Sequence, residues 1–188
     1  MAAIAVAGVG LMVVCSSSVA AAMMMGGEEK EDPIVKTPDT PSGPTLPSGQ
    51  YVKLVQTSLT DVINLAELEV FAKAGTTNLA AGKTVTSSAF HPAGPLPHLV
   101  DGVITGYNFA HTMNEVADTE DSMLIDLGSV QEIEKIKITN RTDCCTERAI
   151  GIKVVILGAD GTTVIKETTA ITTDAATYTF TFPGTAWV

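Results

Sequence analysis

EIEKIKIT, residues 132–139, places three isoleucines between charged side chains and leads directly into NRTDCCTER, residues 140–148. β-Branched residues in a short run favour an extended strand. Other stretches of the same character, bounded by turn-forming residues, are YVKLVQ (51–56), NLAELEV (64–70), MLIDLG (123–128), IKVVILG (152–158), TTVIKET (162–168) and TYTFTF (177–182). So many short strands in one chain of this length predict an all-β sandwich or barrel.

The connections between these stretches also suit an all-β fold. Asp160 and Gly161 stand between two predicted strands, where an Asp-Gly pair predicts a hairpin turn. Between residues 80 and 121 the pattern is looser and contains Pro92, Pro95 and Pro97, which predicts long loops. Long loops at one end of a sandwich are frequent places for binding sites.

Bulk properties exclude some classes of function. The chain has 188 residues, enough for one well-packed domain and additional segments. A net charge of −10 argues against a nucleic-acid-binding protein, which needs a basic surface. The sequence contains no GxSxG, HExxH, P-loop or dinucleotide fingerprint, so we predict that the protein is not an enzyme.

The first fifty residues differ from the rest in composition. Residues 2–25 carry no charge and, as a helix, would cross a hydrocarbon core of about 30 Å. Three interpretations stay open: a retained membrane anchor, a cleavable secretory signal, and an apolar helix buried in a larger assembly. A missing basic n-region favours the anchor, and the acidic flank favours an extracellular or luminal domain.

These differences predict three parts along the chain. Residues 1–27 form an apolar helix, and residues 28–50 form an acidic, proline-rich linker with five of the nine prolines. Such a linker cannot bury a core and prefers an extended path. The folded domain then spans residues 51–188.

Several motifs in this domain occur together in one known family. NLAAGKTVTSS (78–88), LVDG (99–102), His-Thr (111–112), IDLG (125–128) and NRTDCCTER followed by Gly151 stand in this order. The domain resembles the coagulation factor V/VIII type C, or discoidin-like, domain and within that group the fucolectins. The resemblance implies a jelly-roll β-sandwich. Strands that close the domain in the family precede NLAAGK here, so we expect a circular permutant with Tyr51 near Val188.

The resemblance implies a sugar site. Fucolectins hold fucose with two arginines and a histidine, and the matching residues are Arg141, Arg148 and His111, which would donate to the ring oxygen and hydroxyls. The planar fork of arginine suits such oxygens better than the point charge of lysine. Asp143 would orient one arginine; the alternative is an aspartate that caps the loop.

The two adjacent cysteines, Cys144 and Cys145, are the second implied feature of the site. In the family, such a pair forms a disulfide that offers an apolar surface to one face of the sugar. An oxidising compartment is needed for this bond, and two buried thiols or metal ligands are the alternatives. Tyr107 and Phe109 would give an apolar face to the fucose methyl group, or else pack within the loop.

The family also implies a structural Ca²⁺ beneath the loops. Ca²⁺ prefers hard oxygen ligands. The matching ligands are the side chains of Asp101, Glu67 and Asn108 and the backbone carbonyls near His98 and Val103. The alternative for Glu67 is a place on a plain solvated strand face, because it alternates with apolar residues.

Together these features predict a fucose-binding lectin module, held on a stalk by the anchor for attachment. Its partners would be fucosylated or related glycans, and weak single sites imply an oligomer or array. The alternative is a structural or adhesion component of a virion or cell envelope, such as a minor capsid protein that contacts capsid proteins. Asn140-Arg141-Thr142 is a glycosylation sequon, which is either unused or would crowd the site.

Overall fold

The structure is a computed structural model that describes residues 45–113, 120–184 and 187–188. The predicted apolar helix (1–27) and most of the predicted linker (28–50) lie outside these residues. Within the described ranges, no helix is long and apolar enough to span a membrane.

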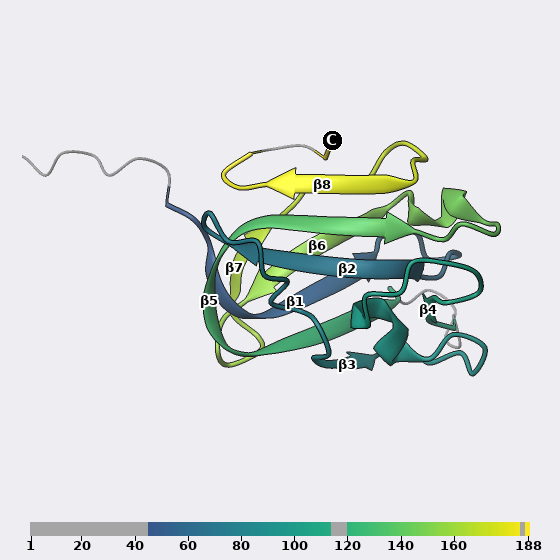
Figure 1. Ribbon diagram of the computed structural model, residues 1–188, viewed down its shortest axis with the longest axis horizontal. Coiled ribbons are helices and arrows are strands. Elements are labelled where there is room, and N and C mark those ends of the chain that lie inside the picture. Colours follow the sequence, from purple (N-terminus) through teal and green to yellow (C-terminus); the bar gives the residue numbers. More distant parts are fainter. Residues whose placement is uncertain (1–44, 114–119, 185–186) are drawn as a thin grey trace, which may run out of the picture. The chain divides into compact units, whose positions relative to one another are not determined.

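The described part of the chain is all-β, as predicted, and contains no α-helix (Figure 1). Two short 3₁₀ helices, η1 (Leu96–Val100) and η2 (Thr146–Ala149), lie in the connections. The strands are β1 (Ser48–Gln56), β2 (Asn64–Ala72), β3 (Thr84–Ser87), β4 (Ala110–His111), β5 (Ser122–Asn140), β6 (Ile152–Leu157), β7 (Val164–Glu167) and β8 (Thr177–Thr181).

Strand β5 joins the two layers of the fold. Its first part pairs with β1 and β3, and its second part pairs with β2 and β8. Gly128, with φ of 87°, lies where the strand bends, and glycine adopts this angle without steric penalty. The sequence predicted two strands here, whereas the structure has one curved strand (Figure 1). All pairings are antiparallel, which is consistent with the predicted discoidin-like β-sandwich.

The isoleucines of residues 132–139 lie in the core. Ile133, Ile136 and Ile138 are all fully buried, although the first two are three residues apart. Strict alternation would expose one of them. A register shift opposite Phe71 and Ala72 adds the extra residue, so that all three point inward.

The two ends of the domain are neighbours, although not through the expected pair. Tyr51 pairs with Asp126 of β5 and Leu157 of β6, and Val188 bonds to Thr179 of β8. The residues that share a hollow are Thr45 and Pro47 at the start and Phe182 and Pro183 near the end. This proximity is compatible with the permuted strand order that the resemblance implies.

The predicted hairpin at Asp160 is confirmed. The Asp160 carboxylate accepts hydrogen bonds from the backbone N–H groups of Thr162 and Thr163, at 2.9 and 2.8 Å. The described residues between 80 and 121 are mostly loop, as predicted, but they also form β3 and β4, which the sequence pattern did not indicate. These loops converge with η2 at one end of the sandwich (Figure 1).

Candidate functional site

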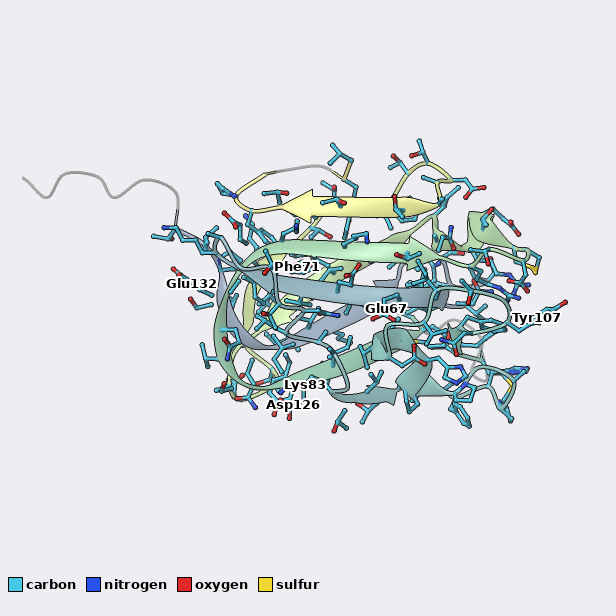
Figure 2. The ribbon with its side chains drawn as sticks, viewed as in Figure 1. Glu67, Phe71, Lys83, Tyr107, Asp126 and Glu132 are labelled. Carbon is cyan, nitrogen blue, oxygen red and sulfur yellow. A yellow bond between two sulfur atoms is a disulfide. The ribbon has the colours of Figure 1, made fainter. Side chains whose placement is uncertain are left out.

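The predicted site residues from three separate segments meet at this end of the molecule. His111 lies on β4, Arg141 directly follows β5, and Arg148 lies on η2. Strand β4 pairs with the first residues of β2, which brings His111 opposite Asn64. Figure 2 shows Tyr107 projecting into solvent at the same end.

Arg141 is held on three sides. Its Nε and Nη2 donate to the two carboxylate oxygens of Asp143 at 2.8 and 2.5 Å. The guanidinium group lies 3.8 Å above the ring centre of Phe109, and the whole residue is only 9% exposed. A bidentate carboxylate and an aromatic face fix the plane of the guanidinium group. Asp143 therefore orients Arg141 as the sequence interpretation expected.

Asp143 stays ionised over the whole physiological range. The hydrogen bonds from Arg141 lower the pKa of Asp143 to about 2. The charge on this carboxylate offsets one of the two arginine charges at this end of the domain. The pair therefore contributes a fixed orientation and little net charge.

Asn64 connects the two arginines. Its side chain is fully buried, and with its oxygen facing the guanidinium groups it accepts hydrogen bonds from Nη1 of Arg141 at 3.2 Å and Nη1 of Arg148 at 3.1 Å. An amide oxygen has two lone pairs, so it can accept both bonds at once. One buried acceptor therefore sets the spacing between the two cationic side chains.

The backbone around Arg148 is tied to β1. Gln56 is fully buried, and its Nε2 donates to the carbonyl oxygens of Arg148 and Ile150 at 3.0 and 3.1 Å. Gly151 follows with φ of 91°, and a Cβ there would lie 2.4 Å from Oε1 of Gln56. Glycine is thus required at this position both by its backbone angle and by the available space.

His111 is half-buried beside these cations. Burial lowers its pKa, the contact with the carbonyl oxygen of Thr112 opposes this, and the neighbouring His91, Arg148 and Arg141 lower the pKa further. Nδ1 of His111 contacts the carbonyl oxygen of Thr112, which can only accept a hydrogen bond. In the neutral ring the proton is therefore on Nδ1, and Nε2 presents a lone pair. The neutral His111 can thus accept a hydrogen bond from a ligand, whereas the family resemblance implied that it donates one.

His91 packs against this histidine. The two rings are 4.7 Å apart, and the N–H of His91 donates to the carbonyl oxygen of His111. Gly94 permits the approach, because a Cβ there would lie 2.4 Å from Cβ of His111. The loop that contains His91 thus forms one wall of the candidate site.

Cys144 and Cys145 form the expected disulfide, with Cα atoms 3.8 Å apart. Cys145 adopts a left-handed backbone conformation with φ of 60° and directly precedes η2. Cys144 is exposed and Cys145 is half-buried, so the disulfide is partly open to solvent. In the sequence the pair lies between Arg141 and Arg148. A pair of free thiols or metal ligands is therefore not what the structure has.

The two aromatic residues that were predicted together have different surroundings. Phe109 is 7% exposed and packs beneath Arg141, so it supports the site as a loop-packing residue and offers no open face to a sugar. This corrects one of its two interpretations. Tyr107 is 81% exposed and stays available for contact with a ligand.

Asn140 of the glycosylation sequon is buried and fully engaged. Its Nδ2 donates to the carbonyl oxygens of Thr146 and Ala175 at 2.8 and 3.0 Å, and the residue is 1% exposed. A glycan is attached through this same nitrogen, so the folded domain has no room for it. The structure favours an unused sequon.

The residues proposed as Ca²⁺ ligands also converge. Nδ2 of Asn108 lies 3.0 and 3.1 Å from the carboxylate oxygens of Asp101 and 2.7 Å from the carbonyl oxygen of Val103. Three oxygens thus surround the amide nitrogen of Asn108, which donates to them. His98 lies in η1 just before them, and its Nδ1 is buried without a partner among the described residues.

Glu67 is not on a solvated face, so that alternative is wrong. It is 2% exposed; Oε2 accepts a hydrogen bond from the N–H of Gly102 at 3.0 Å, and Oε1 is buried without a described partner (Figure 2). Burial, opposed by the hydrogen bond from Gly102 and reinforced by the charge of Asp101, raises the pKa of Glu67 to about 7.

The donor set at this position suits a hard cation. A buried carboxylate oxygen without a partner is costly, and a bound cation would satisfy it. The described residues contain no group of three or more His, Cys, Asp or Glu side chains placed to hold a metal ion. A Ca²⁺ here would therefore need the carbonyl and amide oxygens in addition to Glu67 and Asp101.

Sequence reasoning missed Asn64, Gln56 and His91, which all contribute to this end of the domain. Each belongs to a segment remote in sequence from NRTDCCTER, and none stands in a recognisable motif. Gln56 and Asn64 do carry one signal. Each is a polar residue at the end of a predicted apolar strand, where a buried hydrogen-bonding role is common.

Comparison with known proteins gives one match. Residues 98–187 are similar to the F5/F8 type C family in its NedA-like, galactose-binding form. No curated protein and no solved structure matches the chain significantly. The similarity supports carbohydrate binding in general, and galactose-binding domains of this type are typically binding modules and not enzymes. The matched range contains His111 and the whole of NRTDCCTER, whereas Asn64 lies outside it.

Proposed function

We propose that the protein is a lectin that binds fucose or a closely related sugar through Arg141, Arg148 and His111. The observation that carries this proposal is the shared hydrogen bond of the two arginines to Asn64. Because that acceptor is buried, both guanidinium groups are positioned before any ligand arrives, which reduces the entropy lost on binding.

The two arginines supply directed donors. Among the described residues, Asp143 and Asn64 take three N–H groups of Arg141, and Asn64 takes one of Arg148. The remaining N–H groups are left for a ligand. Because they belong to fixed planes, they suit oxygens in fixed directions, such as the ring oxygen and hydroxyls of a sugar.

His111 distinguishes a sugar from a simple anion. With its proton on Nδ1, the neutral ring offers only an acceptor at Nε2. A ligand oxygen that accepts from arginine and also donates to His111 must carry a hydrogen atom. A hydroxyl group meets this requirement, whereas a carboxylate or sulfate oxygen does not.

The disulfide and Tyr107 complete the proposed site with apolar surface. The exposed part of the Cys144–Cys145 ring would contact one face of the sugar, and the exposed ring of Tyr107 would contact a methyl group. Ca²⁺ would be held by Glu67, Asp101, Asn108 and the carbonyls near His98 and Val103. Its role would be structural: it would fix the loop that precedes His111 and would not contact the sugar.

We further propose that the module serves attachment from a membrane or virion surface, anchored through residues 2–25. A single shallow sugar site is weak, and several copies on one surface raise the effective affinity without any new contact. The oxidising conditions outside the cytosol would also maintain the disulfide.

A glycan array with the full-length, oxidised, Ca²⁺-loaded protein tests the sugar proposal. We expect retention on fucosylated glycans and competition by free L-fucose that exceeds competition by D-galactose. Arg148→Met should reduce the affinity about tenfold or more, because it removes charge-assisted hydrogen bonds. Arg148→Lys should not restore it, since a point charge lacks the fork.

Lys135→Met is the matched control for the lost charge. Lys135 lies over the ring of Phe71 on β2, away from His111, and its removal should leave sugar affinity unchanged. Thermal unfolding establishes that all variants fold. If the folded wild type binds no glycan, the sugar proposal is wrong, and the remaining candidate is the structural or adhesion protein that contacts other proteins.

A further inference from the structure

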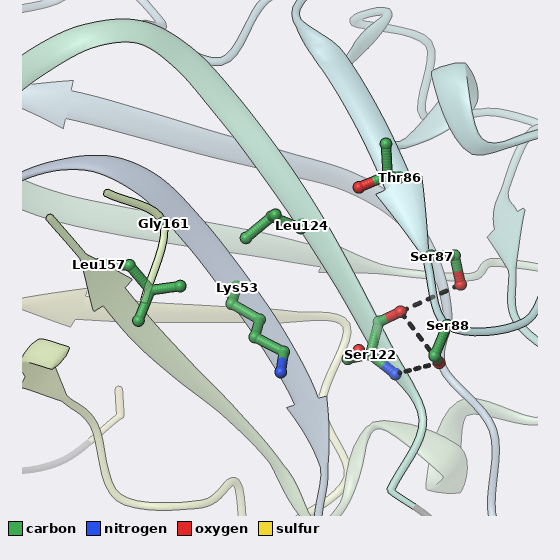
Figure 3. Close-up of a pocket in the computed structure, with 8 residues that line it drawn as sticks. All are labelled: Lys53, Thr86, Ser87, Ser88, Ser122, Leu124, Leu157 and Gly161. Atoms are coloured by element: carbon green, nitrogen blue, oxygen red, sulfur yellow. Dashed lines mark hydrogen bonds between the residues drawn. The ribbon is translucent and has the colours of Figure 1, made fainter. Parts of the chain in front are cut away.

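A second feature lies on the outer face of the sheet formed by β3, β5, β1, β6 and β7. The strand registers place Thr86, Leu124, Lys53 and Val155 in one row across this face, since each pairs with the next. A cavity of about 250 Å³ opens here (Figure 3). It is separate from the arginines and His111, none of which lines it.

Two apolar side chains, Leu124 and Leu157, line this cavity. Leu157 belongs to a small buried cluster with Val55 and Val155 outside the main core, and Leu124 and Tyr51 pack against that cluster. The aliphatic stem of the half-buried Lys53 lies in the same row as two of these side chains. Lysine commonly covers an apolar surface with its stem while it keeps its ammonium group available.

Lys53 has no carboxylate partner among the described residues. The other lysine in the centre of this face, Lys153, bonds to Glu167 at 3.1 Å. Glu120 and Glu167 line an adjoining hollow that Lys53 also borders, but neither lies within ion-pair distance of it. In a protein with a net charge of −10, a half-buried cation that lines a cavity and has no carboxylate partner among the described residues marks a place for a negative group.

Hydroxyl groups line the rim of the same cavity. Ser87 and Ser88 donate to the carbonyl oxygen of Ser122 at 3.0 and 3.4 Å, which connects β3 to β5 (Figure 3). The side-chain hydroxyls of Ser122 and Thr86 make no hydrogen bond within the part of the chain that the structure describes. Both are therefore available as neutral donors in the cavity that Lys53 also lines.

We propose that this cavity is a second binding site, specific for a sugar that carries a carboxylate or sulfate group. Lys53 would bind the acidic group, Ser122 and Thr86 would bind neighbouring hydroxyls, and Leu124 and Leu157 would contact the ring. The volume suits one sugar residue, because sites for larger ligands start at about 300 Å³. The net charge of −10 disfavours a long polyanion. This site goes beyond the proposed arginine site and does not depend on it.

Amide NMR titrations of the full-length protein with galactose 6-sulfate, N-acetylneuraminic acid and neutral galactose test this proposal. The first two sugars represent the two sources of negative charge. We expect at least one of them to shift the amides of Thr86, Ser122 and Leu124, and galactose to leave these amides unchanged. Lys53→Met should weaken that binding about tenfold or more, because it removes the charge-assisted bond.

Lys153→Met is the matched control. It removes an equal charge from the same face of the sheet, but the ammonium group of Lys153 is already paired with Glu167. Equal losses in both variants, or shifts confined to residues around Arg148, would overturn the proposal. Inorganic sulfate that gives the same shifts as galactose 6-sulfate at the same concentration would reduce the site to an ion site and would also overturn it. Arg148→Met should leave the shifts at Ser122 intact, which separates this result from the fate of the proposed fucose site.

Discussion

The side-chain oxygen of Asn64, at the first position of β2, lies 3.1 Å from Nη1 of Arg148 on η2. Asn64→Ala removes this acceptor and leaves the donors of two buried or half-buried guanidinium groups unpaired. We expect a loss of about 1–3 kcal/mol in the free energy of unfolding. Sugar affinity should fall by about tenfold as well, because the arginines lose their fixed spacing. Chemical denaturation and glycan binding measure the two effects.

Asn78→Ala provides the control for this variant. Asn78 accepts hydrogen bonds from the N–H groups of Val70 and Ala80, both at 3.0 Å, at the opposite end of β2. It should lower stability and leave sugar affinity unchanged. Equal affinity losses in both variants would show that Asn64 acts only through general stability.

The lowered pKa of His111 predicts the pH dependence of sugar binding. Because the pKa of His111 lies below the usual value for histidine, affinity should stay constant as the pH falls through the usual titration range and should decrease only under more acidic conditions. His91→Gln removes a neighbour that lowers the pKa of His111, so that pKa should rise. The decline should then begin at a higher pH, and titration calorimetry at several pH values tests this order.

The raised pKa of Glu67 predicts that stability falls as pH rises in calcium-free buffer. The carboxyl group retains its proton up to about pH 7 in the folded state, against 4.5 when unfolded. The contribution of Glu67 to the free energy of unfolding is therefore fully present below pH 4.5. About 3 kcal/mol of it is lost as the pH rises past 7.

Thermal unfolding from pH 4.5 to 8 with a chelator measures this decline. Glu67→Gln should abolish it, whereas Glu69→Gln on the same strand should not, because Glu69 is paired with Lys137. Added Ca²⁺ at pH 8 should stabilise the wild type and leave Glu67→Gln unchanged. Stabilisation of both proteins by Ca²⁺ would contradict the assignment of Glu67 as a ligand.

The burial of Asn140 predicts that the sequon carries no glycan on folded protein secreted from a eukaryotic cell. Peptide mass spectrometry should find Asn140 unmodified. Thr142→Ala removes the sequon at an exposed position. The mass of this variant should differ from that of the wild type only by the substitution itself, and its sugar affinity should be unchanged. Full occupancy at Asn140 in folded protein would contradict the observed hydrogen bonds to Thr146 and Ala175.

The exposed sulfur surface predicts a role in affinity and little role in the fold. Cys144→Ser combined with Cys145→Ser should keep the strands intact, because the two residues close no loop between distant parts of the chain. Sugar affinity should fall, since an apolar contact becomes polar. Circular dichroism and the glycan array separate these effects, and unchanged affinity would exclude the disulfide from the site.

Much of the fold was predictable because strand formation depends on local pattern. Ile136 and Ile138 alternate with charged residues, and Asp160-Gly161 lies between two apolar runs, so each feature can be read within a few residues. The sequence could not show that 123–128 and 132–139 are one strand. That continuity depends on how Gly128 bends the chain and on the pairing of its two parts with different partners.

The site divides in the same way. Arg141 and Asp143 are two residues apart, and Cys144 and Cys145 are adjacent, so local sequence already determined that each pair could meet. Only the tertiary structure decided that Asn64 would bond to both arginines, that Glu67 would be buried, and that Lys53 would line a cavity without a carboxylate partner among the described residues. The physical reason is that burial and pairing between distant residues depend on strand register, and register depends on the fold of the whole domain.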